Sequence, residues 1–174
     1  MTYSITLNVN GIAYPVDVTA HASLLTTVRD QLGLTGSKEG CDDSECGACM
    51  MLLDGRPTNA CSYLAIQADG ASITTVEGLA ENGDLSTLQR VFLEEGGVQC
   101  GFCTPGMLIS ATALLRSNPD PSDEEIRIGL SGNLCRCTGY DGIVKAVHQA
   151  ASGDVPPLRG APVHADTTPP HHAG

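Results

Sequence analysis

Cysteine is the residue type whose number and spacing equip this chain for chemistry. The 174-residue sequence contains eight cysteines, which divide into two sets of four. The first set has the spacing C-x4-C-x2-C followed by a more distant fourth member: Cys41, Cys46, Cys49 and Cys61. The second set consists of two close pairs: Cys100 with Cys103, and Cys135 with Cys137. Four thiolates form a ligand set for iron or zinc, so both sets indicate metal chemistry.

The first set has the spacing of plant-type ferredoxins, in which four cysteines hold one [2Fe–2S] cluster. Three of the thiolates must curl around one side of such a cluster. The small residues Gly40, Gly47 and Ala48 allow the backbone to approach the sulfides and to aim N–H groups at them. A strand pair that begins at Met50 can carry Cys61 back to the loop. We therefore predict that this first set binds a [2Fe–2S] cluster.

The second set lies where the ends of helices are expected. Cys103 directly precedes Thr104-Pro105, which we predict to be the N-cap and first residue of a helix. The N-terminus of a helix favours a thiolate. Two pairs from separate helical hairpins would clamp one cluster and hold the helices together. On spacing alone, structural zinc also fits this set, because four thiolates suit a tetrahedral ion.

Other uses of cysteine fit the sequence less well. Disulfides need an oxidising compartment, and the N-terminal residues show neither the basic region nor the apolar region of a secretory signal. We therefore expect a cytoplasmic protein with reduced cysteines. Buried free thiols do not explain two ordered sets. A [4Fe–4S] cluster commonly uses a C-x2-C-x2-C run, which this sequence lacks.

Composition limits both the partners and the core. The net charge of −11 argues against binding to nucleic acid or to an anionic membrane surface. No stretch approaches the ~20 apolar residues of a membrane-spanning helix. Hydrophobic residues make up 41% of the chain, but there is no Trp and there are only two Phe. The core must therefore be mainly aliphatic, and bound metal would help to stabilise it.

The N-terminal residues, 1–77, show the patterns of a small mixed sheet with one helix across it. Apolar residues alternate over 3–9 and 12–18, and Asn10-Gly11 between them favours a two-residue hairpin turn. The other elements expected here are a helix capped by Ser23 and ended by Gly33, a strand over 50–53, and a strand near 72–76.

From about Gly78 the apolar spacing becomes helical. The expected helices cover 85–95, a segment starting at Thr104-Pro105, a segment led by the capping box Ser122–Glu125, and about 140–147. Four helices with short connections predict a small bundle over residues 78–152. Residues 153–174 contain five of the ten Pro and three of the five His without periodicity, so we expect an extended or disordered tail. We assign no role to His171-His172.

Five sequence motifs, taken together, resemble the iron–sulfur subunit of the xanthine dehydrogenase family of molybdenum hydroxylases. They are Gly40–Cys49, Leu53-Asp54-Gly55, Cys61, Gln99–Met107 and Gly132–Tyr140. The resemblance extends from about Ile5 to Ala151. Two departures are Met50-Met51, where relatives often have Thr-Val, and Ser44, where many have glycine. Neither departure is at a ligand position.

The resemblance implies an α+β protein with an N-terminal ferredoxin-like (β-grasp) domain followed by an all-α four-helix domain, each with one [2Fe–2S] cluster. It implies an electron-transfer subunit of an oxidoreductase, with no substrate-turnover site of its own. The partners would be a large subunit with a molybdenum–pterin cofactor and a medium subunit with FAD, or a cytochrome in its place. Because this sequence holds neither a flavin nor a molybdenum domain, we expect those partners to be separate polypeptides.

The resemblance also implies an order for electron flow. Electrons would pass from molybdenum to the helical cluster of Cys100, Cys103, Cys135 and Cys137. They would then pass to the ferredoxin-like cluster of Cys41, Cys46, Cys49 and Cys61, and from there to the flavin. Gln99 matches a glutamine that hydrogen-bonds the pterin, and Cys137 matches a position beside that cofactor. Two other hypotheses remain open: a stand-alone ferredoxin, which leaves the helical half unexplained, and a zinc-stapled interaction module.

Overall fold

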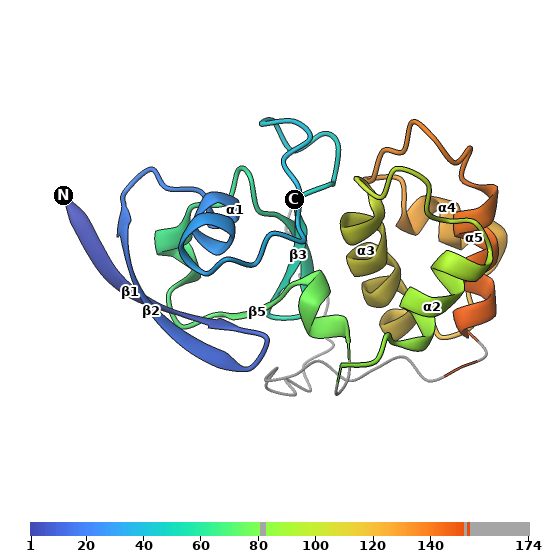
Figure 1. Ribbon diagram of the computed structural model, residues 1–174, viewed down its shortest axis with the longest axis horizontal. Coiled ribbons are helices and arrows are strands. Elements are labelled where there is room, and N and C mark those ends of the chain that lie inside the picture. The colour runs from blue at the N-terminus through green and yellow to red at the C-terminus, as the bar shows by residue number, and fades with distance from the viewer. Residues whose placement is uncertain (81–82, 152, 154–174) are drawn as a thin grey trace, which may run out of the picture.

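The computed structural model describes residues 1–80, 83–151 and 153. These residues form an α+β fold, with a mixed sheet towards one end of the molecule and helices towards the other (Figure 1). The α+β class predicted from the sequence is therefore confirmed. The expected tail and the pair His171-His172 lie outside the described residues, apart from Gly153.

The sheet has five strands in the order β2-β1-β5-β3-β4. Their bounds are β1 Thr2–Val9, β2 Ile12–Thr19, β3 Met50–Leu53, β4 Arg56–Asn59 and β5 Ser72–Thr74. β1 and β2 form the predicted antiparallel hairpin, and Asn10 and Gly11 take the left-handed conformation that its turn requires, with φ of 52° and 80°. β5 pairs in parallel with β1 and antiparallel with β3, so it joins two hairpins into one sheet.

The predicted N-terminal helix is present in a shortened form. It comprises α1, Leu24–Thr26, and a π-helical continuation over Thr27–Gln31. The Ser23 hydroxyl caps it by accepting a hydrogen bond from the N–H of Thr26 at 3.0 Å. The buried side chains of this segment share one aliphatic core with β1, and that core covers one face of the sheet. Two 3-10 segments, Ala65–Ala68 and Val76–Leu79, lie on either side of β5.

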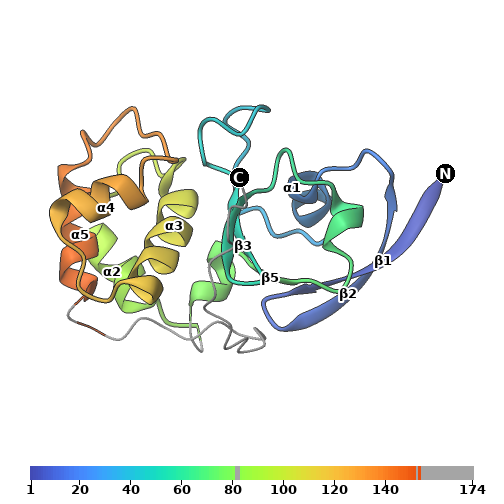
Figure 2. The same ribbon diagram turned by 180° about the vertical axis from the view of Figure 1, so that it is seen from behind.

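The helical half contains α2 Thr87–Glu94, α3 Thr104–Ser117, α4 Asp123–Gly129 and α5 Asp141–Ala151. Figure 2 shows α3 beside β3, with the other helices on its far side. Met50 and Leu52 of β3 belong to the helical core, whereas Met51 belongs to the core of the sheet. Successive side chains of a strand point to opposite faces, so β3 lies between the two cores and contributes side chains to both. This explains why its four residues are all apolar.

Two helix starts differ from the sequence prediction. α2 begins after Ser86, which forms a capping box with Gln89, so Leu85, expected in this helix, precedes it and is 52% exposed. α3 begins one residue early, at Thr104, so the N-cap position belongs to Cys103. The predicted capping box of Ser122 with Glu125 is present at the start of α4. The second shift places a cysteine directly on the end of a helix.

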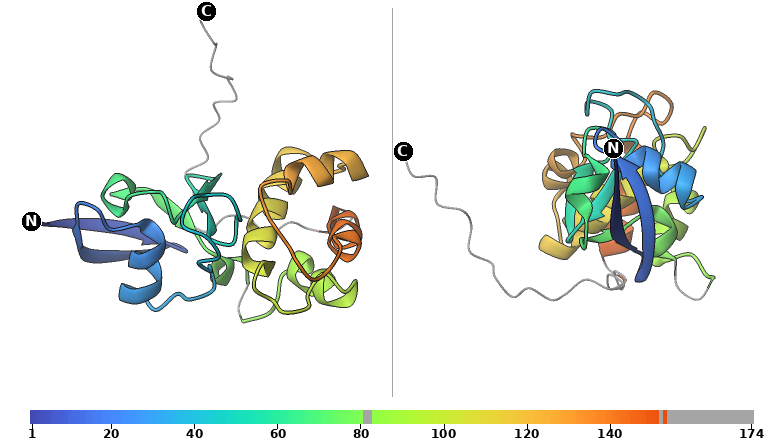
Figure 3. Two further views of the ribbon diagram at one scale, coloured as in Figure 1. Left: turned by 90° about the horizontal axis from the view of Figure 1, so that it is seen from above. Right: turned by 90° about the vertical axis from the view of Figure 1, so that its left-hand side faces the viewer.

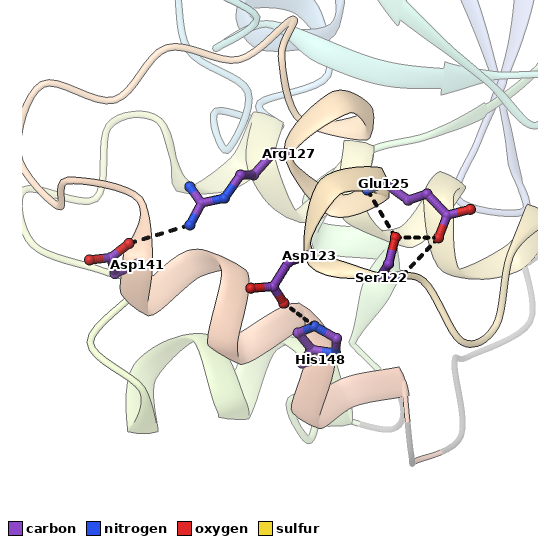
Figure 4. A network of polar contacts seen from close by, with 6 residues as sticks. All are labelled: Ser122, Asp123, Glu125, Arg127, Asp141 and His148. Carbon is purple, nitrogen blue, oxygen red and sulfur yellow. Dashed lines mark hydrogen bonds and ion pairs between the residues drawn. The ribbon is translucent and has the colours of Figure 1, made fainter.

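Polar contacts connect α4 with α5 on the surface of the helical half (Figure 4). His148 is paired with Asp123, and Arg127 lies 3.5 Å from a carboxylate oxygen of Asp141. These side chains are largely exposed, so water and salt screen the pairs and their contribution to stability is small. Within the described residues, no helix has both the length and the apolar character needed to cross a membrane.

Candidate metal centres

The first cysteine set, which we call the loop site, takes Cys41, Cys46 and Cys49 from an irregular segment before β3 and Cys61 from the turn after β4. Cys41 and Cys46 are half-buried in this loop, while Cys49 and Cys61 are buried. Backbone N–H groups point at the sulfurs: that of Cys46 lies 3.4 Å from the Cys41 Sγ, and that of Ala48 lies 3.5 Å from the Cys46 Sγ. Such donors stabilise thiolate charge, as the sequence predicted for this loop.

The four thiols of the loop site are arranged as two pairs. Cys41 interacts with Cys46, and Cys49 interacts with Cys61. Burial, together with the neighbouring Cys61 thiol, raises the pKa of Cys49 to about 12. The hydrogen bonds of backbone N–H groups, that of Asp43 first, instead lower the pKa of Cys41. In the metal-free chain the Cys49 thiol is thus protonated at neutral pH, and metal must displace its proton on binding.

The second set, which we call the helix-end site, takes its pairs from two loops. Cys100 and Cys103 lie just before and at the start of α3, and the other pair lies between α4 and α5. Figure 1 shows these loops at the same edge of the helical half. The Sγ atoms of Cys100 and Cys137 are 3.5 Å apart and exposed. Cys103 interacts with Cys135 further inside.

The two inner thiols of the helix-end site have opposite pKa shifts. Burial raises the pKa of Cys103 to about 12, and the adjacent Cys135 adds to this effect. Burial acts in the same direction on Cys135, but hydrogen bonds from the hydroxyl and N–H of Thr138, together with those of the Cys137 N–H and the Cys103 thiol, outweigh it and lower that pKa to about 7. The thiol of Cys135 is therefore the one of this pair that ionises near neutral pH in the metal-free chain.

Both sites present thiols in pairs, which is the arrangement that a [2Fe–2S] cluster requires, because each iron takes two terminal cysteines. In the part of the chain that the structure describes, no three His, Cys, Asp or Glu side chains converge on a single metal position. When bound, a [2Fe–2S] cluster supplies a one-electron redox centre. The sequence-predicted ligands thus come together as two groups of the right composition for two clusters.

The two sites are joined directly by hydrogen bonds. The N–H of Leu134 donates to the carbonyl of Cys46 at 2.9 Å, and the Asn133 side-chain amide donates to the carbonyl of Gly47 at 3.0 Å. Asn133 is only 3% exposed. A shallow pocket at this junction is lined from both halves by Gly40, Cys46, Ala48, Phe102, Cys103 and Leu134, among others. Figure 3 shows the loop before β3 facing the helical half.

Glycines make this junction possible. A Cβ atom on Gly106 would lie 2.1 Å from the carbonyl oxygen of Gly47, and one on Gly47 would lie 2.2 Å from that of Gly132. Such distances are far below van der Waals contact, so only glycine lets these backbones approach. Sequence reasoning did not identify Asn133 as a functional residue. Its signal was its place within Gly132–Tyr140 and the presence of a small residue in each segment that meets it.

Gln99 and Cys137, predicted to face the pterin of a partner, are both exposed. Cys137 belongs to the exposed outer pair of the helix-end site, and Gln99 adjoins the other member, Cys100, in the chain. Their surface position leaves them accessible to another protein. Contact with a pterin stays a prediction.

Comparison with known proteins places these features in context. A family model described as a [2Fe-2S] binding domain matches residues 75–148. The small FeS subunit of nicotinate dehydrogenase from Eubacterium barkeri is 53% identical over 147 residues, which cover 84% of this chain and 94% of the relative. A probable xanthine dehydrogenase subunit from Bacillus subtilis (strain 168) is 51% identical over 140 residues, covering 80% of each protein.

The fold has a solved counterpart. A chain in the crystal structure of quinoline 2-oxidoreductase from Pseudomonas putida 86 superposes with a TM-score of 0.83 at 44% identity. The match covers 86% of this chain and 96% of that one. All three relatives are thus similar along most of this chain rather than in a single motif.

Proposed function

Because this chain belongs to the small iron–sulfur subunits of the xanthine dehydrogenase family of molybdenum hydroxylases, we propose that each of its cysteine sets binds one [2Fe–2S] cluster. The chain is an electron-transfer component of such an oxidoreductase complex rather than a stand-alone ferredoxin. The loop site would be held by Cys41, Cys46, Cys49 and Cys61, and the helix-end site by Cys100, Cys103, Cys135 and Cys137.

The pairing of thiols in both sites is the observation that carries this proposal. In each site one pair lies further out and the other further in, as the exposed pair of Cys100 with Cys137 and the inner pair of Cys103 with Cys135 illustrate. Two pairs can each hold one iron of a binuclear cluster. Backbone N–H groups then stabilise the negative charge on sulfur, and burial of the inner pair excludes water from that side of the cluster.

The proposal extends to two domains. Residues 1–77 would form the ferredoxin-like (β-grasp) domain, and residues 78–152 the four-helix domain. Support comes from the two separate hydrophobic cores, one under the sheet and one among α2–α5. The boundary falls within the 3-10 segment Val76–Leu79, where the chain leaves the sheet.

We also propose partners and a direction of electron flow. Gln99 and Cys137 would meet the molybdenum–pterin cofactor of a large subunit, because both are exposed at the outer pair of the helix-end site, Cys137 as a member of it and Gln99 beside Cys100. Electrons would then cross to the loop site and leave to a medium FAD subunit or a cytochrome. The direct hydrogen bond from Leu134 to Cys46 supports this route, since it holds ligand segments of both sites in contact.

Metal analysis of the purified complex tests the proposal. Two clusters require about four iron and four acid-labile sulfides for each copy of this chain. Half of those amounts would indicate one cluster, as in a stand-alone ferredoxin, and zinc in the helix-end site would contradict the proposal. Mass spectrometry of the co-purifying proteins identifies the large and medium subunits in the same preparation.

A further inference from the structure

A closed circuit of hydrogen bonds surrounds Cys135 of the helix-end site. The hydroxyl of Thr138 donates to the Cys135 Sγ at 3.1 Å, and the N–H of Thr138 approaches the same sulfur at 3.5 Å. The N–H of Cys135 itself donates to the Tyr140 hydroxyl at 2.7 Å. The N–H of Tyr140 donates to the Thr138 hydroxyl oxygen at 3.2 Å. Each polar group in the circuit thus has a partner that fixes its direction.

Tyr140 holds a conformation that favours this circuit. Its φ is +70°, in the left-handed region that residues other than glycine rarely adopt. The turn directs its N–H to the Thr138 hydroxyl oxygen and its ring hydroxyl to the N–H of Cys135. Because the Thr138 oxygen accepts from Tyr140, its own proton is left to point at the sulfur. The strained residue therefore orients the Thr138 hydroxyl as a donor.

In the loop site, the hydrogen bonds to the cysteine sulfurs are all longer than the 3.1 Å contact of the Thr138 hydroxyl with Cys135. Backbone N–H groups approach Cys41 and Cys46 at 3.4 and 3.5 Å. The hydroxyl of Ser44 lies 4.0 Å from the Cys61 Sγ and is closely paired with Ser62. A hydrogen bond to a ligand sulfur raises the reduction potential of an iron–sulfur cluster, because reduction adds negative charge that the donor stabilises.

We propose that Thr138 is a positioning residue that raises the reduction potential of the helix-end cluster, by donating its hydroxyl proton to the sulfur of Cys135. This inference rests on the proposed function, since it requires a cluster at that site. The redox step is the gain of one electron by the cluster from an external reductant. No bond to sulfur breaks in it, and the hydroxyl proton stays on Thr138. The Thr138 hydroxyl would thereby favour electrons on the helix-end cluster over the loop cluster.

Redox titration of the assembled complex tests this role. Thr138→Val removes the hydroxyl at nearly constant volume, and we expect the ratio of reduced to oxidised helix-end cluster at a fixed potential to fall about three- to tenfold. A tenfold change corresponds to about 59 mV for a one-electron couple. Paramagnetic resonance follows the reduced form of each cluster separately, so the loop cluster is an internal control whose midpoint stays fixed.

Two further variants separate the hydroxyl from the side chain that carries it. Thr138→Ser keeps the hydroxyl, so we expect the midpoint potential of its helix-end cluster to lie close to that of the wild type. Thr112→Val is a matched control, because the Thr112 hydroxyl donates to the carbonyl of Leu108 within α3 rather than to a cluster ligand. We expect it to leave both midpoints unchanged.

Several outcomes would overturn the inference. They are an unchanged helix-end midpoint in Thr138→Val, equal shifts of both clusters, or a Thr138→Ser midpoint no closer to wild type than that of Thr138→Val. Iron content is measured for each variant. If Thr138→Val loses helix-end iron, Thr138→Ala replaces it in the titration, and loss of iron from both means that the hydroxyl holds the cluster rather than tuning it. Absence of iron from the wild-type helix-end site would instead contradict the proposed function.

Discussion

The loop site and the helix-end site each contain four thiols, but the fold brings those thiols together in different ways. Three loop-site cysteines lie within one irregular segment, and backbone N–H groups serve its outer sulfurs. The helix-end site draws its pairs from two loops that only the packing of α3, α4 and α5 brings together, and a side-chain hydroxyl serves one sulfur. The comparison teaches that one site depends mainly on local chain geometry and the other on tertiary packing.

Loss of a ligand at each site is expected to have the largest effects and to show the order of the two centres. Cys103→Ser in the assembled enzyme should stop substrate from reducing either cluster, because serine is a harder and poorer ligand for iron and, in the proposed order, the helix-end site receives electrons first. Anaerobic mixing with substrate, followed by paramagnetic resonance, measures this. Reduction of the loop cluster by substrate in this variant would reverse the proposed order.

Cys46→Ser makes the converse change at the loop site. Substrate should still reduce the helix-end cluster in a single turnover, while electrons stall before the external acceptor and steady-state turnover collapses. The same rapid-mixing experiment, with acceptor reduction followed in parallel, distinguishes the two variants. Acceptor reduction at the wild-type rate would show that the loop cluster does not lie on the route.

The junction between the sites can be broken without touching a ligand. Gly47 has φ +68°, and a Cβ atom there would lie 2.2 Å from the carbonyl oxygen of Gly132. We therefore expect Gly47→Ala to lower the free energy of unfolding by roughly 2–5 kcal/mol. Gly33→Ala is the matched control, since Gly33 has φ +71° with open space around it, and about 1 kcal/mol is expected there. Thermal unfolding of the complex compares them, and equal losses would contradict the close approach.

Asn133→Ala weakens the same junction more gently. The carbonyl of Gly47 loses the amide of Asn133 but keeps the N–H of Met50 at 3.1 Å, so no unpaired acceptor is created. We therefore expect a loss of about 1 kcal/mol in unfolding free energy, near the value of one ordinary hydrogen bond. Denaturant titration measures it. A loss as large as that of Gly47→Ala would mean that Asn133 supports more than this one contact.

The smallest expected effect is confined to the helical half. Ser122→Ala removes the cap of α4 and should cost about 0.5–1 kcal/mol at neutral pH. The Ser122 hydroxyl and N–H hold the pKa of Glu125 below its usual value, so the capping box stabilises α4 above the ordinary pKa of glutamate. That contribution is lost as the pH falls through the lowered folded-state pKa. The difference between variant and wild type in denaturant titrations should therefore shrink on acidification, and growth of the difference would be contrary to this.

Local patterns predicted the parts of the fold that local physics determines. Asn10-Gly11 indicated its hairpin, and Ser122 with Glu125 indicated its capping box, because each depends on neighbouring residues alone. Leu85 was wrongly expected in a helix, because the stronger cap at Ser86 starts α2 two residues later.

The same distinction applies to the candidate sites. Spacing alone predicted the loop-site ligand set, since its thiols are close in sequence. Spacing left the second set ambiguous between zinc and iron, and the match of residues 75–148 to a [2Fe-2S] binding domain favours iron. Sequence did not indicate the junction, because Asn133 and Gly47 meet only after both halves have folded. Nor did it indicate the strained turn at Tyr140, because no residue preference predicts a left-handed tyrosine; a local hydrogen bond from the N–H of Cys135 to its hydroxyl accompanies the turn.

The position of β5 has a consequence for the order in which the chain assembles. β5 comes last in sequence among the strands but lies at the centre of the sheet, between β1 and β3. The hairpins β1–β2 and β3–β4 are local, whereas the parallel pairing of Asn8 with Ser72 must close a long loop and is intrinsically slow. All four loop-site thiols precede β5 in the sequence. During synthesis they therefore leave the ribosome before the strand that joins the two hairpins has emerged. Iron can meet its first set of ligands on a chain whose sheet is still in two pieces.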